Sequence, residues 1–268
     1  MAYFHSMDAG VLPGVLLAFG FVLCIVVMAT FFPTSVMKPT PEGQAEAEGD
    51  QMTLTQALLK LVPIATLIAL VLGGIYGGLF TPTESGAVGA LGAFLLAIVK
   101  RRLTFAKLWR VLVETGHITA SIAALAIGAT MYSRMLALSG LPSHLGMWMA
   151  EANLDFYGFI FAFIVIVIFL GTILDSVSIM LVMLPLVLPI LTAMNADLVW
   201  FGVVTVIAVE IGLLTPPFGL AVFTIKATLN NSKISAADIF IGALPFVLVM
   251  ILTLAVVVLV PWFTYALL

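Results

Sequence analysis

The sequence predicts an all-helical protein that crosses a membrane several times. Of its 268 residues, 63% are hydrophobic and 9% are charged, and the mean hydropathy is +1.27. Soluble globular chains average roughly 45–50% apolar and about 25% charged residues, so this chain has too little polar surface to cover a water-soluble core. A membrane-spanning helix needs about 20 residues. We expect about six crossings, one re-entrant helical hairpin and one broken helix.

The first half of the chain contains four of the expected crossings. They cover residues 11–32, 57–80, 86–99 and 118–138. A polar linker over residues 33–54 separates the first two. The segment GGIYGG (73–78) should loosen the end of the second run, because glycine costs about 1 kcal/mol per helical site relative to alanine. The segment TPTES (81–85) should break the chain before the third run.

Two amphipathic segments flank the fourth crossing. Residues 104–115 place apolar side chains at helical spacing, with Lys107 and Arg110 between them. This pattern is typical of a helix lying at the membrane interface. A shorter amphipathic segment follows the crossing at residues 142–151.

A hairpin is predicted over residues 156–191. It contains two apolar runs, 156–170 and 179–191, separated by the segment GTILDSVS (171–178). The runs have 13 to 15 residues, and at 1.5 Å per residue they cover only about two-thirds of a hydrocarbon core ~30 Å thick. Their length therefore favours a re-entrant hairpin over two full spans.

A broken helix and a final span complete the chain. The run at 198–229 is too long for one straight helix and is interrupted by GLLTPPFG (212–219), where two consecutive prolines remove backbone donors. The last span lies within residues 236–268 and ends in aromatic residues of the kind enriched at membrane interfaces.

The distribution of basic residues predicts the orientation. If the loop at 100–110 is cytoplasmic, alternating the crossings places nine of the ten Lys and Arg residues on the cytoplasmic side, with Arg134 as the exception. Both termini are then periplasmic.

Chemistry is expected at the two interruptions, because irregular backbone inside a bilayer is tolerated only where protein buries it or water reaches it. Discontinuous helices present carbonyls at one half-helix end and amides at the other, which suits a cation and an anion respectively. The polar groups offered are oxygens, from Thr172, Asp175, Ser176, Ser178, Thr215 and the backbone carbonyls freed by Pro216 and Pro217. Such a set suits a hard cation such as sodium and not a transition metal.

Each polar feature also has a structural interpretation. Asp175 is either a functional carboxylate at membrane depth or the N-cap of the hairpin's second helix. Glu210 either binds a proton or sodium, or pairs with a neighbouring helix. Glu84 is a coupling acid or, as we favour, a cap on the helix that starts at TPTES. The Pro216–Pro217 pair alone indicates a structural kink as readily as a site.

Several classes of function are excluded by the composition. The net charge of −3 predicts no nucleic-acid partner, and the single cysteine, Cys24, allows no intrachain disulfide or thiolate metal site. No Ser-His-Asp, paired-carboxylate or Cys-His arrangement suggests an enzyme. An intramembrane hydrolase built on Ser176 or Ser178 with Asp175 would lack a nearby histidine or lysine. No organic cofactor is expected.

Three segments together resemble the large membrane subunit of TRAP (tripartite ATP-independent periplasmic) transporters. They are GGIYGGLFTPTESGAV (73–88), FLGTILDSVSIMLVMLPLVLPIL (169–191) and EIGLLTPPFGLAVF (210–223). The resemblance implies an inner-membrane, elevator-type sodium symporter built from two inverted repeats. It also implies a small membrane subunit, a periplasmic substrate-binding protein, and organic acids such as C4-dicarboxylates or sugar acids as substrates.

The resemblance also assigns roles along the chain. Residues 1–32 would be the last span of the first repeat, 55–155 the scaffold and arm helices, and 156–229 the transport-domain elements. Sodium would be held by Gly171, Thr172, Asp175, Ser176, Ser178, Gly212 and Thr215, and the substrate by Ser178, Thr215, Pro216, Pro217 and Gly219.

One departure from the family pattern concerns the preceding repeat. The chain lacks the first hairpin and the first Pro-Pro break, so it resembles the C-terminal part of a large subunit. It would be one half of a split protein that works with a separate first-repeat chain, the product of a truncated gene, or a fragment. The alternative is an accessory or scaffold membrane subunit that lacks a complete site.

Overall fold

The all-α class is confirmed by the computed structural model. It describes residues 9–31, 54–101, 103–151, 155–229 and 234–266, and contains no strand within them. The predicted linker at 33–54 lies almost wholly outside these residues. The chain divides into two compact units, one of residues 37–120 and the other of residues 1–36 and 121–268. Five of the described helices are long and apolar enough to cross a membrane. They are α2 (Val11–Phe31), α6 (Pro82–Val99), α7 (Phe105–Ser139), α10 (Ser176–Ala193) and α13 (Ala236–Leu259).

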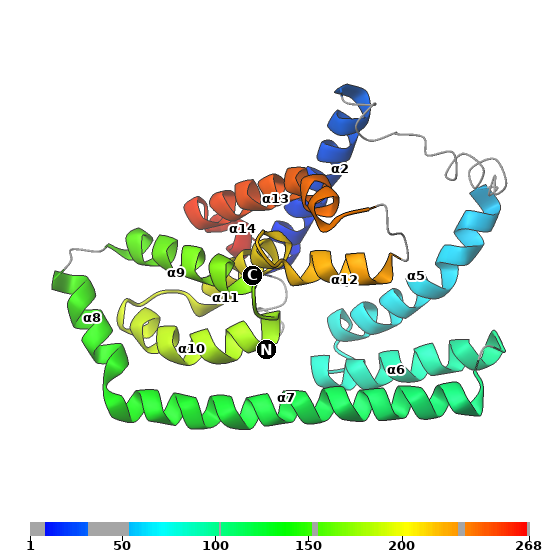
Figure 1. Cartoon of the computed structure of the whole chain (residues 1–268), viewed down its shortest axis with the longest axis horizontal. Helices are drawn as coiled ribbons and strands as arrows, with labels where there is room; N and C mark the ends of the chain where they lie inside the picture. The colour runs from blue at the N-terminus through cyan, green and yellow to red at the C-terminus, as the bar shows by residue number, and fades with distance from the viewer. Residues whose placement is uncertain (1–8, 32–53, 102, 152–154, 230–233, 267–268) are drawn as a thin grey trace. The chain divides into compact units, whose positions relative to one another are not determined.

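The smaller unit is built on two helices that pack side by side, α5 (Leu54–Tyr76) and α6 (Pro82–Val99) (Figure 1). Glycines on α6 allow the close approach. A Cβ added at Gly92 would lie 2.8 Å from Leu67 Cδ2, and one at Gly89 would lie 3.0 Å from Val71 Cγ2. Helices in lipid associate through such small-residue contacts.

The turn between α5 and α6 is tighter than the sequence predicted. The helix α5 ends at Tyr76, inside the glycine-rich segment, and Gly78 adopts a φ of 68°. The helix α6 already begins at Pro82, so four of the five TPTES residues belong to its first turn. The reason is a capping box. The Glu84 amide donates to Thr81 Oγ1 at 3.3 Å, and the Thr81 amide donates to Glu84 Oε2 at 2.8 Å.

The helix α7 (Phe105–Ser139) joins two segments that the sequence analysis separated. Its 35 residues run without interruption through the predicted interfacial helix and the predicted fourth span. Gly116 lies between those segments, but one glycine costs only about 1 kcal/mol, and the helix contains no proline. The prediction of two separate helices was therefore wrong.

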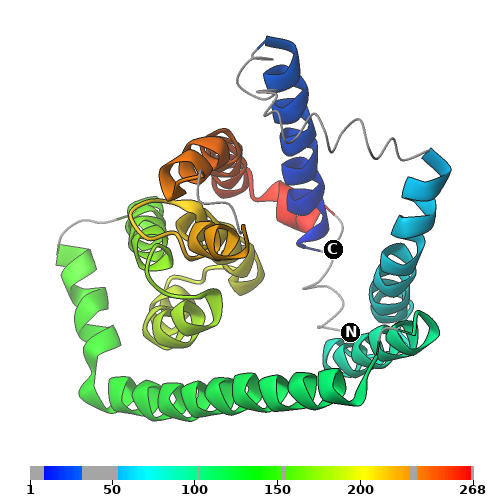
Figure 2. The same ribbon diagram turned by 45° about the vertical axis from the view of Figure 1, so that its right-hand side comes forward.

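The larger unit is organised around α11. Its helices are α2 (Val11–Phe31), α8 (Leu141–Glu151), α9 (Phe156–Gly171), α10 (Ser176–Ala193), α11 (Leu198–Leu214), α12 (Leu220–Thr228), α13 (Ala236–Leu259) and α14 (Trp262–Tyr265). The helix α11 contacts α9, α10, α12, α13 and α14, and Figures 1 and 2 show it lying among α9, α10 and α13. One face of it, with Leu198, Val206 and Glu210, stays exposed. The helix α2 packs on α13 and α14.

The core of this unit forms where α9, α11 and α13 meet. The rings of Phe163 and Phe201 lie 4.7 Å apart between centroids. The buried indole of Trp200 donates from Nε1 to the Val257 carbonyl at 2.9 Å. In a continuous helix residue 261 would supply that carbonyl with an amide, but Pro261 has none. Trp200 therefore satisfies a carbonyl that the end of α13 leaves without a backbone donor.

The start of α11 is also fixed electrostatically. The Asp197 carboxylate caps the helix, accepting from the Val199 and Trp200 amides at 2.8 and 2.9 Å. Burial and, secondarily, this carboxylate raise the pKa of Tyr265.

The two hairpin helices are longer than the apolar runs that predicted them. The helix α9 has 16 residues and α10 has 18, because Ser176 to Ser178 form the first turn of α10 and Thr192 and Ala193 extend its end. By length and composition α10 is able to cross a membrane. The argument that the run is too short to span was therefore wrong for α10 but holds for α9, which remains among the shorter apolar helices. The re-entrant hairpin stays a prediction.

We expect Trp200→Phe to lower the free energy of unfolding by about 1–3 kcal/mol, because it leaves the Val257 carbonyl without a donor. Thermal unfolding in detergent measures the change. Trp262→Phe is the matched control, since the side chain of Trp262 is 62% exposed and should tolerate the change. Equal destabilisation by both substitutions would contradict this role of Trp200.

Candidate functional site

The hairpin tip and the helix break are held together by two buried glycines, Gly171 at the end of α9 and Gly212 near the end of α11. A Cβ added at Gly171 would lie 2.8 Å from Gly212 Cα, and one added at Gly212 would lie 2.6 Å from the Ile168 carbonyl oxygen. Both neighbours are backbone atoms, which cannot rotate away. The two helices therefore touch along their backbones, next to both interruptions.

Asp175 organises the tip of the hairpin. It is the N-cap of α10, and its Oδ2 accepts from the Val177 and Ser178 amides at 3.0 and 3.2 Å. Its Oδ1 accepts from the Ser178 hydroxyl. An ionised carboxylate offers roughly four lone-pair positions, and these three donors leave one free. The structural interpretation of Asp175 as a cap is thus confirmed, and the carboxylate still has acceptor capacity.

Two threonines flank the tip and the break in the same manner. The Thr172 hydroxyl donates to the Phe169 carbonyl at 2.8 Å, and the Thr215 hydroxyl donates to the Ile211 carbonyl at 2.6 Å. Each hydroxyl has one proton and two lone pairs. Because the proton is used within the helix, the oxygens are left as acceptors or cation ligands.

The break in α11 frees backbone groups on both of its sides. Pro216 and Pro217 have no amide to pair with the Gly212 and Leu213 carbonyls. The Thr215 amide donates to the Gly212 carbonyl at 3.0 Å instead. The Leu213 carbonyl has no such donor at position 217, because Pro217 has no amide hydrogen. On the other side, α12 starts after Gly219, which has a φ of 48° and supplies no side-chain cap. The first amides of α12 therefore have no capping side chain.

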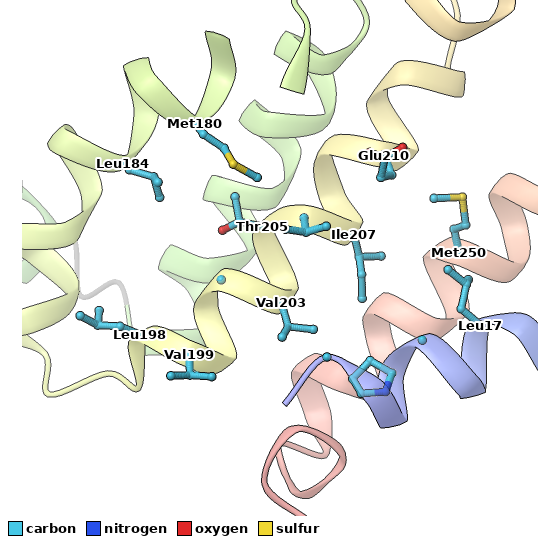
Figure 3. A pocket seen from close by; sticks show the side chains of 15 residues that line it. Leu17, Met180, Leu184, Leu198, Val199, Val203, Thr205, Ile207, Glu210 and Met250 are labelled. Atoms are coloured by element: carbon cyan, nitrogen blue, oxygen red, sulfur yellow. The ribbon is translucent and has the colours of Figure 1, made fainter. Parts of the chain in front are cut away.

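The two acids outside these interruptions lie elsewhere. Glu84 belongs to the smaller unit, where it caps α6. Glu210 is exposed on α11 and faces a groove lined by apolar side chains, including Met180 and Met250. Figure 3 shows it among them. Glu210 therefore does not share the capping network of the hairpin tip.

The arrangement offers oxygen ligands and uncapped amides. Among the described residues, no group of three or more His, Cys, Asp or Glu side chains is placed to hold a metal ion. The ligands that remain are one carboxylate, serine and threonine hydroxyls, and backbone carbonyls. Oxygen sets of this kind bind hard cations.

Sequence reasoning identified both interruptions but missed the contact that joins them. The structure brings Gly171 and Gly212 together, and separately joins Asp175 to Ser178. The available signal was a glycine at the first position of each interrupting segment. Helices that approach within backbone contact need glycine there, so the pair could have been predicted as a crossing point.

Comparison with known proteins places these features in a family context. Residues 1–263 match the model of the DctM component of tripartite ATP-independent periplasmic transporters. The chain is 29% identical over 260 residues to the C4-dicarboxylate TRAP transporter large permease protein DctM of Pseudomonas aeruginosa, covering 97% of this chain and 58% of that protein. It is 30% identical over 258 residues to the sialic acid TRAP transporter large permease protein SiaM of Vibrio cholerae, covering 96% and 57%.

A shorter match extends the comparison to a third organism. The chain is 32% identical over 202 residues to the C4-dicarboxylate large permease protein DctM of Rhodobacter capsulatus, covering 75% of this chain and 45% of that protein. The chain thus spans about half the length of these relatives.

We expect Gly171→Ala and Gly212→Ala each to destabilise the protein by about 1–3 kcal/mol, because the new Cβ atoms meet backbone and force α9 and α11 apart. Thermal unfolding in detergent measures the effect. The control is Gly242→Ala on α13, where an added Cβ also meets nothing within 4 Å. It should be neutral or stabilising, since alanine favours helix. Tolerance of alanine at both Gly171 and Gly212 would contradict the contact.

Proposed function

Since the chain belongs to the DctM component family of tripartite ATP-independent periplasmic transporters, we propose that it is the site-bearing part of a sodium-coupled organic-acid importer. The family consists of transporter membrane subunits rather than enzymes, and with the apolar helices it indicates a multi-pass inner-membrane protein. The observation that carries the proposal is the Gly171–Gly212 contact, which sets two interrupted helices side by side.

Sodium is the proposed coupling ion. The proposed sodium ligands lie at the hairpin tip and at the end of α11. They are the carbonyls of Gly171 and Gly212, the Asp175 carboxylate, and the hydroxyls of Thr172, Ser176, Ser178 and Thr215. Support comes from the hydroxyl protons of Thr172 and Thr215, which are already donated to carbonyls of their own helices. Their oxygens would therefore be available to a cation as acceptors, without rearrangement of the helix.

The proposed substrate is a small organic acid. The relatives act, by their names, on C4-dicarboxylates and sialic acid, which all carry carboxylates. The uncapped start of α12 after Gly219 offers amides and the positive end of a helix dipole to a carboxylate. Ser178, Thr215, Pro216 and Pro217 would line the same place.

The partners follow from the tripartite organisation of the family. We propose a small membrane subunit, a periplasmic substrate-binding protein, and the first-repeat half of the large subunit, whether on a separate chain or not. Both termini would lie in the periplasm, with the lipid bilayer around the membrane subunits.

The two roles of Asp175 can be separated by replacing the residue with asparagine. Asp175→Asn keeps an oxygen for the cap but removes the charge, so thermal stability should change little while the sodium concentration for half-maximal uptake rises about tenfold or more. Uptake of a radiolabelled organic acid by the assembled transporter in proteoliposomes measures this. Asp197→Asn is the matched control, because Asp197 caps α11 through the same two amide bonds. Equal sodium dependence in both variants would refute the assignment.

Labelling a cysteine at Ser176 tests whether the hairpin is re-entrant. A tip that stops within the membrane should react slowly with a membrane-impermeant maleimide, and sodium should slow it further. A full span would place residue 176 at the cytoplasmic surface, where labelling would be fast and independent of sodium. Labelling rates in inverted vesicles, with and without sodium, distinguish the two.

The alternative function is an accessory or scaffold subunit without a complete site. Uptake should separate the two. We expect no transport by the chain alone and sodium-driven transport once the remaining half of the large subunit is present. Absence of uptake in the complete assembly, with normal assembly of the subunits, would favour the scaffold.

A further inference from the structure

A second feature of the larger unit is a groove of about 630 Å³ between α2, α10, α11 and α13. The wall that α11 contributes consists of two rows of residues, and within each row the residues are four positions apart in the sequence. One row is Leu198, Gly202, Val206 and Glu210. Residues at this spacing share one face of a helix. From Leu198 to Glu210 the row extends about 18 Å at 1.5 Å per residue. The groove is therefore long enough to take several turns of another helix.

The groove has the surface that membrane helices use for packing. Gly14 on α2 and Gly202 on α11 both line it, and a Cβ added at either would meet nothing within 4 Å. These glycines do not serve contacts within the described chain. Small residues at this kind of position allow the backbone of an incoming helix to approach closely.

Glu210 gives the groove its chemical specificity. It ends the α11 row and is exposed, and the other lining residues of α2, α10, α11 and α13 include no titratable or charged group. Carboxylates in membrane segments are costly unless they face a partner or a water-filled cavity. The groove is apolar, so the partner of Glu210 has to come from whatever fills it.

We propose that this groove seats a membrane helix from the part of the large permease outside these 268 residues, and that this helix brings a hydrogen-bond donor to Glu210. The chain spans only 45–58% of the relatives' lengths, which leaves ample sequence to supply the helix. The proposal rests on family membership and not on the sodium coupling proposed above.

Two other occupants fit the groove less well. A lipid acyl chain is apolar throughout and offers Glu210 no donor. A second copy inserted in the same orientation would pair identical faces at the same depth. That would place one Glu210 carboxylate close to another, and like charges that share a site disfavour each other. A helix with a Ser, Thr, Asn, Lys or Arg opposite Glu210 satisfies the carboxylate and fills the space over the glycines.

Photo-cross-linking in the host membrane tests the occupant directly, using the protein as the cell expresses it. A diazirine side chain replaces Val206, which lines the groove and is 46% exposed. We expect cross-links to an apolar segment outside the 268 residues, identified by mass spectrometry. The control position is Leu248, 58% exposed on α13 and outside the groove, which should cross-link to phospholipid. Cross-links from position 206 only to lipid, to a second copy, or within the chain would overturn the proposal.

Substitutions in the groove separate packing from hydrogen bonding. Gly202→Leu should reduce the cross-link from position 206 about tenfold or more by filling the space, while Gly242→Leu, at another open helical glycine, should leave it unchanged. Glu210→Gln, which keeps an acceptor, should retain the cross-link, and Glu210→Leu should reduce it about tenfold. If Glu210→Leu leaves the cross-link undiminished, the proposed hydrogen-bond donor to Glu210 is refuted. If Gly202→Leu leaves it undiminished, the proposed helix in the groove is refuted. The cross-linking measurement needs neither sodium nor substrate. The proposal about the groove can therefore be tested even if the proposed sodium coupling is refuted.

Discussion

The contact between Gly171 and Gly212 is the constraint on which the rest of the larger unit depends. In a bilayer, backbone groups that leave a helix have to be satisfied by protein or by water, so an interruption is tolerated only where other elements enclose it. Here α9 and α11 approach until their backbones touch, which places the hairpin tip beside the end of α11. The core of Phe163, Phe201 and Trp200 then holds the same two helices together along their length.

The same side chains serve structure and proposed function at once. Asp175 caps α10, and Thr172 and Thr215 donate their protons to carbonyls of their own helices. These bonds fix the oxygens in place and leave lone pairs free, which would pre-organise the proposed cation site. A residue that caps a helix therefore need not be excluded from a site, and the decision between the two roles has to come from removing the charge while keeping the cap.

The sequence predicted the apolar runs and the interruptions well, because both depend on local composition. The break at Pro216–Pro217 and the cap at Glu84 are examples. The sequence analysis misplaced helix ends that depend on capping, and it missed a contact between residues that are far apart in the chain. Helix α6 starts earlier than its apolar run, α7 passes through Gly116, and α10 is longer than its run because polar Ser176 and Ser178 belong to its first turn. The Gly171–Gly212 contact joins residues 41 positions apart in the sequence, and its local signal, the glycine that opens each interrupting segment, was not used in the sequence analysis.

The most direct test of the account is equilibrium binding of radioactive sodium to the purified, assembled transporter, comparing the natural sequence with Gly212→Ala. The account predicts saturable binding by the natural sequence and a large loss of affinity in Gly212→Ala, since the added Cβ separates the hairpin tip from the end of α11. Saturable binding that is unchanged by Gly212→Ala, in a variant whose destabilisation shows that the helices have moved, would contradict the claim that this contact builds the cation site.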